Sequence, residues 1–277
     1  MYRVSKVLNN NGVIAIDMDE NKEYVILGKG VGFGKKVSQR FDKPEGCTTY
    51  RLEQETERGS AKELVKGIEP EYLEIADAIL TESQKVFGDS IDRGILFPLA
   101  DHISFAVARI RRNEQISNPL TEDIKVLFYS EFKVAETLKT ILRERLQIEI
   151  DDHEVGYVAL HIHSAIGDEK VSVAMQTARA VRECIGMLEK ATGKPIDVLS
   201  LSYNRLMNHM KYMVARASTG EKLNLDMNEY MLDQYPQAYK VATDICKNLE
   251  GCIGHKLDET ETGYLAMHIQ RVYKDAV

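Results

Sequence analysis

The sequence lacks a long, uncharged apolar segment. No stretch of the 277 residues approaches the run of about 18 apolar residues that a membrane-spanning helix needs. The N-terminal MYRVSKVLNN contains no continuous apolar run and no small-residue cleavage site, so we do not expect a secretory signal. These absences predict a cytoplasmic protein without membrane insertion.

Cysteine is also scarce. The four cysteines form no CxxC pair: Cys47, Cys184, Cys246 and Cys252. Scattered thiols of this kind predict free cysteines in a reducing compartment, rather than a disulfide framework or a zinc site. The remaining composition, 44% hydrophobic and 29% charged, is typical of a soluble globular protein. The length predicts two or three domains.

The common catalytic motifs are missing. The chain has no GxSxG, no Walker lysine loop, no HExxH and no Gly-rich dinucleotide turn within a βαβ unit. No helix-turn-helix pattern precedes position 60, so a DNA-binding regulator is disfavoured. We expect a protein that is not an enzyme and needs no cofactor or metal. A phosphocarrier or metal-dependent enzyme with an accessory β domain remains the alternative.

Negative charge predominates, but it is unevenly distributed. The net charge of −7 argues against a chain that binds nucleic acid along its whole length. Residues 29–43 nevertheless carry five basic side chains and one acid, Asp42. This basic patch is a candidate contact for phosphates.

An internal repeat organises the chain beyond the head. Residues 154–162 (EVGYVALHI) match residues 261–269 (ETGYLAMHI) at an offset of 107. The same offset aligns 102–109 with 209–216 and 133–135 with 240–242, without a gap. Three blocks in one register indicate a duplicated domain whose copies each have their own core.

Both copies have helical periodicity. Apolar residues recur at i, i+3, i+4 and i+7 after Leu99 and again after Leu206. Asp151 with Glu154, and Asp258 with Glu261, predict capped helix starts with Asp at N-cap and Glu at N3. We predict a bundle of about five helices in each copy.

The head is different in kind. Residues 2–8, 13–17 and 23–27 are short, rich in Val, Ile and Tyr, and separated by Asn- and Gly-containing turns, which predicts an antiparallel meander. The predicted fold class is therefore multidomain, with a small antiparallel β domain followed by two duplicated all-α helical bundles. The predicted bounds are 1–57 for the head, 58–66 for a linker, 67–170 for the first bundle and 171–277 for the second.

Each copy contains two histidines in its matched blocks. His102 and His161 in the first copy, and His209 and His268 in the second, are separated by 59 residues. A histidine in an apolar helical stripe is most often a core residue, and metal binding and acid–base catalysis are further possibilities. Repetition favours a shared task, and a neutral imidazole is a competent phosphoryl acceptor.

Charged neighbours of these histidines fit the same interpretation. Arg109 and Arg216 follow His102 and His209 by seven residues, two turns along the same helix face, where they could pair with a phosphoryl group. Asp101 could orient His102. Metal binding is disfavoured because His163 has Gln270 as its counterpart and no repeated ligand set completes a site.

The segment Gly28–Lys36 (GKGVGFGKK) is the candidate ligand site of the head. It lacks the register of a nucleotide-binding P-loop, and a flexible surface loop is the simplest interpretation. Exposed backbone, Lys29 for phosphates and Phe33 as a stacking ring favour RNA instead. The amides of Asn9, Asn10 and Asn11 can hydrogen-bond to base edges of unpaired RNA.

The motifs together resemble the BglG/SacY-type transcriptional antiterminators. The resemblance covers essentially the whole chain and rests on Lys6–Asn11, Gly28–Lys36, Asp101-His102 and Tyr157–His161, with His209 and His268 as equivalents. It implies a co-antiterminator (CAT) RNA-binding domain followed by two phosphotransferase-system (PTS) regulation domains. Such proteins are homodimers that bind an mRNA leader hairpin, the ribonucleic antiterminator, which overlaps a terminator, and so permit transcription of sugar-uptake genes.

The resemblance also implies residue roles. The RNA-contact candidates are Lys6, Asn9, Asn11, Gly28, Lys29, Gly30 and Phe33. His102 and His161 are implied targets of the phosphorylated domain of a PTS sugar permease (enzyme II), which inactivates the protein when sugar is absent. His209 and His268 are implied targets of the histidine-containing phosphocarrier protein. The GKGVGFGKK segment and the His161–His163 ending are most similar to the glucose-responsive branch, with β-glucosides or sucrose as the alternative sugars.

Overall fold

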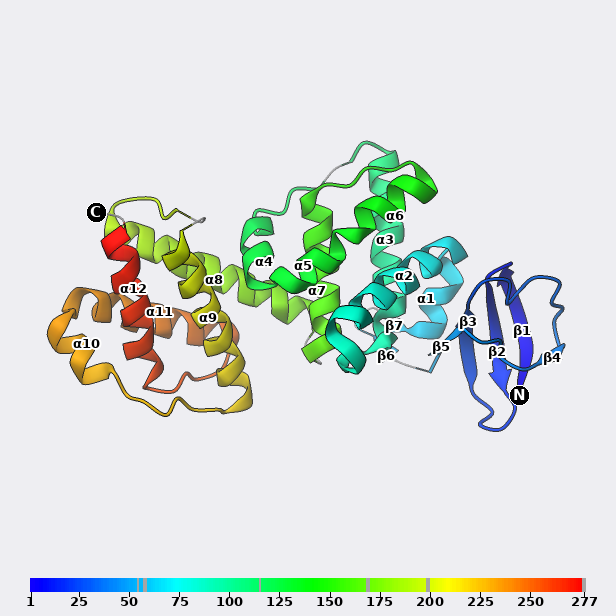
Figure 1. The fold of residues 1–277 in the computed structure, drawn as a ribbon, viewed down its shortest axis with the longest axis horizontal. Helices are drawn as coiled ribbons and strands as arrows, with labels where there is room; N and C mark the ends of the chain where they lie inside the picture. Colours follow the sequence, from blue (N-terminus) through cyan, green and yellow to red (C-terminus); the bar gives the residue numbers. More distant parts are fainter. Residues whose placement is uncertain (54, 57–58, 115, 168–169, 198–199, 276–277) are drawn as a thin grey trace. The chain divides into compact units, whose positions relative to one another are not determined.

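The computed structural model describes residues 1–53, 55–56, 59–114, 116–167, 170–197 and 200–275 (Figure 1). Two compact units divide the chain: Met1–Asn118 with Ser130–Val171, and Pro119–Tyr129 with Ser172–Val277. The predicted boundary between positions 57 and 58 lies outside the described residues, and the domain bounds stay predictions. Over the described ranges, no helix has the length and apolarity needed to span a membrane.

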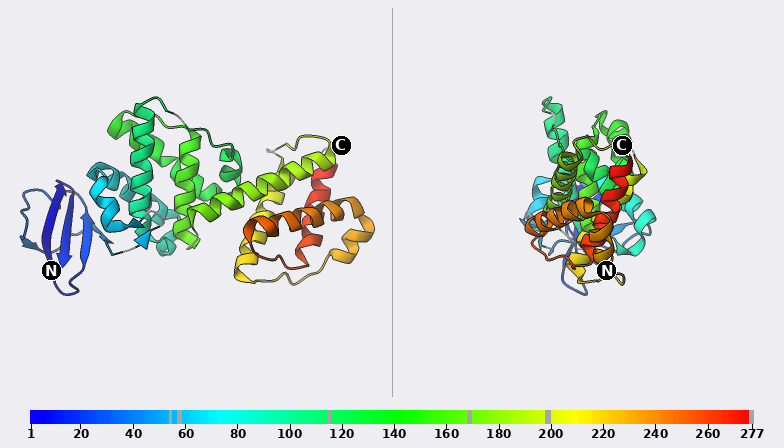
Figure 2. Two further views of the ribbon diagram at one scale, coloured as in Figure 1. Left: turned by 180° about the vertical axis from the view of Figure 1, so that it is seen from behind. Right: turned by 90° about the vertical axis from the view of Figure 1, so that its left-hand side faces the viewer.

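The head is an antiparallel sheet. Its five strands are β1 (Tyr2–Asn9), β2 (Gly12–Asp17), β3 (Glu23–Leu27), β4 (Arg40–Phe41) and β5 (Thr48–Arg51), in the order β4-β1-β2-β3-β5. β1, β2 and β3 lie side by side in both views of Figures 1 and 2. These three are the predicted meander, which is confirmed. A two-stranded hairpin follows, with β6 (Glu55–Thr56) and β7 (Gly59–Ser60).

Alternation along the strands builds the core of the head. Val13 and Ala15 of β2 point to one face of the sheet and are fully buried. They form a cluster with Val4, Ile26 and Val31, and Val31 lies in the Gly28–Lys36 loop. The core therefore anchors this loop to the sheet through one apolar side chain.

The helices of the first copy begin after the hairpin. They are α1 (Ala61–Gly67), α2 (Pro70–Phe87), α3 (Leu96–Arg111), α4 (Thr121–Leu127), α5 (Tyr129–Ala135), α6 (Thr137–Leu146) and α7 (Asp152–Gly167), with short 3-10 turns η1 (Gly88–Ser90) and η2 (Arg93–Ile95). α1 falls within the predicted linker, and its Ala61 and Val65 are buried.

The second copy contains α8 (Val171–Thr192), α9 (Leu201–Thr219), α10 (Asn228–Gln234), α11 (Pro236–Ile253) and α12 (Glu261–Asp275). Local signals set its boundaries. The Ser200 hydroxyl caps α9 by accepting from the Tyr203 N–H, and Pro236 occupies N1 of α11. α11 and α12, orange and red in Figure 2, pack closely.

The predicted helix starts are right in one copy and wrong in the other. Asp151 accepts from the N–H groups of His153 (3.0 Å) and Glu154 (3.2 Å) and so caps α7. α12 instead begins at Glu261, and the Asp258 carboxylate accepts from the N–H of Thr260, which precedes the helix. Glu261 therefore stands at the first helical position and not at N3. In both copies the glutamate side chain is held by an arginine.

One helix departs from the repeat. α4 and α10 are equivalent at the offset of 107 residues and have the same length. α10 packs on α11 and α12 of its own copy, whereas α4 packs on α9 within the second compact unit. The duplicated sequence thus gives two different placements for one element.

Candidate functional sites

The asparagine turn and the glycine-rich loop of the head lie side by side. The Asn11 carbonyl accepts from the Gly28 N–H (2.9 Å), and the Asn11 Oδ1 accepts from the Gly30 N–H (2.9 Å). The Gly32 N–H donates to the Asn10 carbonyl at 3.0 Å. The asparagine turn and the glycine-rich loop are separate segments of the sequence. Hydrogen bonds from the N–H groups of the loop therefore join them in the structure.

The alternating glycines of this loop have two separate causes. A Cβ at Gly32 would lie 2.0 Å from the Asn9 carbonyl oxygen, and one at Gly28 would lie 2.4 Å from the Cys47 Sγ, so neither position has room for a side chain. Gly30 and Gly34 have φ of +74° and +67°, a left-handed conformation that favours glycine. The GxGxGxG spacing therefore has two causes. Close packing excludes a side chain at Gly28 and Gly32, and a positive φ favours glycine at Gly30 and Gly34.

The loop presents an aromatic ring to solvent. Phe33 is 74% exposed, and Lys29 of the same loop is also exposed. A loop that presents an exposed ring, a cation and bare backbone can stack a base and contact a phosphate. Of the seven predicted RNA-contact residues, six belong to this surface.

Lys6 lies elsewhere. It lines a cavity of 200 Å³ together with Lys62 and Lys66 of α1. Glu23 also lines this cavity and is paired with Lys62, so Lys6 lies in a mixed charged cluster that the sequence analysis did not predict.

The four predicted histidines form two pairs. His102 on α3 and His161 on α7 have ring centroids 5.4 Å apart. His209 on α9 and His268 on α12 are 4.8 Å apart and stacked at 24°. Residues 59 positions apart in the sequence thus come into contact in each copy, because the two helices that hold them pack together.

A buried carboxylate joins each pair to an arginine. Glu154 Oε1 accepts from Arg109 Nη2 (2.8 Å), and Glu154 Oε2 lies 3.4 Å from His102 Nε2. In the second copy Glu261 accepts from Arg216 Nε (2.6 Å) and Nη2 (2.9 Å) and lies 3.7 Å from His209 Nε2. The two glutamate side chains are 4% and 1% exposed.

These contacts revise the sequence-based view of the arginines. Arg109 and Arg216 were expected to face a phosphoryl group, and in the structure each is paired with a glutamate. Glu154 is a carboxylate beside the His102 ring that the sequence analysis did not name for this role. Sequence reasoning assigned Glu154 and Glu261 only to capping, although both recur at the same offset as the histidines and arginines.

Burial keeps the second pair uncharged. Desolvation, followed by the His268 and Arg216 charges, lowers the pKa of His209 to about 3. Desolvation and then the charges of Arg271 and Arg205 lower the pKa of His268 to about 4. Both rings are therefore neutral near pH 7, and the neutral imidazole is the nucleophilic form.

Glu154 remains ionised. Burial alone would raise its pKa, but the His102 ring and the Arg109 guanidinium offset that effect and lower the pKa below its usual value. A fixed negative charge therefore lies next to His102 in the first copy.

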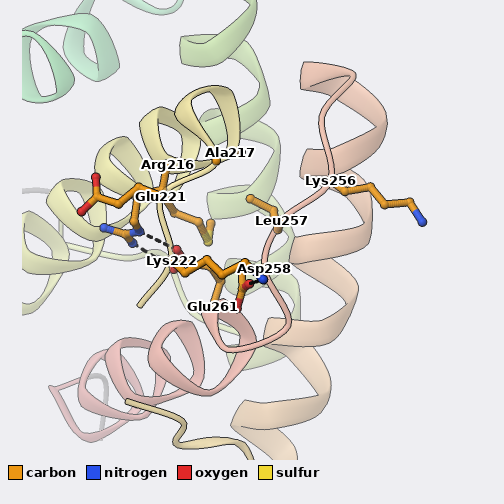
Figure 3. A pocket seen from close by; sticks show the side chains of 10 residues that line it. Arg216, Ala217, Glu221, Lys222, Lys256, Leu257, Asp258 and Glu261 are labelled. Carbon is orange, nitrogen blue, oxygen red and sulfur yellow. Dashed lines mark hydrogen bonds and ion pairs between the residues drawn. The ribbon is translucent and has the colours of Figure 1, made fainter. Parts of the chain in front are cut away.

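A cavity adjoins the Arg216–Glu261 pair (Figure 3). It has a volume of 190 Å³, and its counterpart beside Glu154 measures only 10 Å³. Ala217 in its lining stands where the first copy has the larger Ile110. Figure 3 shows Lys222 paired with Asp258, and Lys256 pointing away from the other labelled residues. Among the described residues, no group of three or more His, Cys, Asp and Glu could hold a metal ion.

Two family models of known proteins match three parts of the chain. The family model described as CAT RNA binding domain matches residues 2–59, and the one described as PRD domain matches residues 77–165 and 182–272. The GlcA/glcB genes antiterminator of Staphylococcus carnosus (strain TM300) is 30% identical over 97% of this chain and 94% of its own length. Transcription antiterminator LicT of Bacillus subtilis (strain 168) is 27% identical over 99% and 100%.

A solved structure matches part of the chain. The crystal structure of GlcT CAT-PRDI matches 60% of this chain and 98% of its own, with a TM-score of 0.52 and 29% identity. The β head, its glycine loop and the two histidine-bearing bundles thus define an RNA-binding regulator of transcription. The chain belongs to the family of transcription antiterminators that combine a CAT RNA binding domain with PRD domains.

Proposed function

We propose that this antiterminator binds a nascent mRNA leader hairpin overlapping a terminator and thereby permits transcription of sugar-uptake genes. The observation that carries the RNA part is the surface formed by the asparagine turn and the glycine loop, with Phe33 74% exposed. Glucose is the proposed sugar, because relatives named GlcT and the GlcA/glcB genes antiterminator match the chain over nearly its whole length.

The two histidine pairs are proposed as phosphorylation sites. The phosphohistidine of the phosphocarrier protein transfers its phosphoryl group to a ring nitrogen of this chain, so that one P–N bond breaks as another forms. The acceptor ring loses its N–H proton, the donor ring takes up a proton, and the donor leaves as a neutral imidazole. Supporting this role, His209 and His268 are neutral near pH 7 and contact each other. The proposed donors are the histidine-containing phosphocarrier protein for His209 and His268, and a permease domain for His102 and His161.

The shared glutamate gives a route from modification to structure. A phosphoryl group on His102 would add about two negative charges beside Glu154, whose carboxylate is already ionised. Arg109 would then have two anions within reach and would be drawn from Glu154 toward the phosphoryl oxygens. Since Arg109 is on α3 and Glu154 on α7, the exchange would alter how these helices pack. We propose that a homodimer in the cytoplasm responds to this change.

Phosphate transfer to the full chain tests the proposal. The chain is incubated with the phosphorylated phosphocarrier protein or the phosphorylated permease domain, and the modified histidines are identified by mass spectrometry. We expect the His209→Ala, His268→Ala double variant to lose transfer from the phosphocarrier. His255→Ala, an exposed histidine of the second copy, is the matched control and should keep it. Undiminished transfer to a variant lacking all four paired histidines would contradict the proposal.

A further inference from the structure

A carboxylate of the first helical domain occupies part of the RNA surface. Glu74, on α2, accepts from Asn9 Nδ2 through Oε1 at 2.7 Å and from Asn11 Nδ2 through Oε2 at 3.1 Å. The two asparagines are 65 and 63 residues away in the sequence. Arg145 Nη1 lies 3.8 Å from Oε2, and the Glu74 side chain is 19% exposed. The amides of two RNA-contact candidates are therefore already bound to an anion.

The chemistry of this contact matches that of the ligand. Amide N–H groups at this turn would donate to base edges or to phosphate oxygens of RNA. A carboxylate offers two acceptor oxygens and a negative charge, as a phosphate group does. RNA that uses these donors must first displace Glu74.

A second cluster holds the head against the same helix. Asp77, one turn after Glu74, accepts hydrogen bonds from the Tyr50 hydroxyl of β5 and from Arg93 Nη2, the latter at 3.0 Å. Arg93 Nη2 also contacts the Tyr50 hydroxyl at 2.8 Å, and its guanidinium lies over the Tyr50 ring at 5.5 Å. Tyr50 is 3% exposed. This anchor keeps Glu74 at a high effective concentration next to the asparagines.

We propose that Glu74 is an intramolecular competitor of RNA, and that release of the asparagine turn from α2 is part of RNA binding. The inference rests on the proposed function, because it takes Asn9 and Asn11 as RNA contacts. The contact lies in the described part of the first unit and involves no phosphorylated residue. It therefore adds a control on RNA affinity that is separate from the histidines.

RNA binding by the full-length chain tests the inference. The probe is the hairpin that the unchanged chain retains most strongly from a pool of RNA hairpins with randomised loops. Glu74→Ala removes both acceptors and should lower the Kd about tenfold. Glu74→Gln keeps the shape and one acceptor and should give a smaller decrease. Glu82→Gln, on the same helix and paired with Lys85, is the control and should leave the Kd unchanged.

Each outcome is decisive. An unchanged or higher Kd for both Glu74 variants, with circular dichroism like that of the parent chain, would overturn the inference and leave the proposed function intact. If the chain and all variants retain no hairpin at all, the RNA proposal fails, and the inference fails with it. A matching NMR test follows the Asn9 and Asn11 side-chain amide signals, which should shift in Glu74→Gln without RNA.

Discussion

Phe33 contributes an exposed aromatic ring to a loop whose backbone is fixed on both sides. Its neighbours Gly32 and Gly34 permit no ordinary side chain, because one is packed against the Asn9 carbonyl and the other has a positive φ. The backbone that carries the ring is thus constrained, and the ring itself is 74% exposed and accessible to a base.

We predict that Phe33→Ala weakens RNA binding by about 5- to 150-fold, the effect of losing about one to three kcal/mol of base stacking. Gel retardation of the full chain measures it. Val37→Ala, which truncates another exposed apolar residue just beyond this loop, should change the affinity little. Equal losses in both variants would show that Phe33 makes no specific contact.

A second prediction concerns the protonation of the second histidine pair. The unfolded chain binds a proton on each histidine near pH 6.5, whereas folded His209 does so only near pH 3. The unfolded state therefore takes up more protons as the pH falls, and the second helical domain loses stability. Between pH 7.5 and 5 the loss at His209 is about 2 kcal/mol.

NMR titration of the His209 and His268 ring signals, assigned with alanine variants, measures the underlying protonation. Neither signal should titrate between pH 8 and 5. A midpoint close to 6.5 at either ring would mean that the rings are not held neutral by burial. The expected fall in stability should also be smaller in His209→Asn, which cannot take up the proton.

At the scale of elements, periodicity and the repeat located helices at α3, α7, α9 and α12, and alternation located the three long head strands. The repeat assigned two histidines to each copy, but their contact, His102 with His161 and His209 with His268, is seen only in the packing of the helices. The glutamate–arginine pairs were missed. Glu154 suits a capping position equally well, and only the three-dimensional packing decides that its side chain turns to Arg109.

The placement of α4 shows a different limit of sequence reasoning. α4 and α10 have the same length and align at the offset of 107 residues, so the repeat predicts equivalent neighbours for both. In the structure α4 carries Asp123, which is 4% exposed and hydrogen-bonded to Tyr203 of α9. Burial raises the pKa of Asp123, and the nearby Arg182 partly offsets this. The counterpart of Asp123 in α10 is Tyr230, which is exposed.

This contact leads to a prediction for stability. Tyr203→Phe removes the hydroxyl but keeps the ring, leaving the buried Asp123 carboxylate short of a donor. We expect the free energy of unfolding to fall by about 1 to 3 kcal/mol. Urea denaturation followed by circular dichroism measures the change.

Tyr212→Phe is the matched control, because Tyr212 lies on the same helix and is 59% exposed. It should leave the unfolding midpoint unchanged. If Tyr203→Phe also leaves the unfolding midpoint unchanged, this hydrogen bond does not hold α4 on α9.

At the scale of the whole molecule, RNA binding and its regulation are assigned to different domains. RNA recognition is assigned to the head, and the histidines belong to the two bundles. Two kinds of carboxylate connect these tasks: Glu154 and Glu261 join histidine to arginine, and Glu74 contacts the asparagine turn. All three are glutamates of helices, and each occupies a position beside its arginine or asparagine partners that a phosphate is proposed to take.

The central claim is that modification of the first histidine pair controls antitermination. The direct measurement is terminator readthrough in a purified transcription reaction, with the leader RNA, the full chain and the phosphorylated permease domain. We predict that this domain abolishes readthrough by the unchanged chain, and that the His102→Ala, His161→Ala variant reads through equally with and without it. Inhibition of that variant to the same extent as the parent chain would contradict the account.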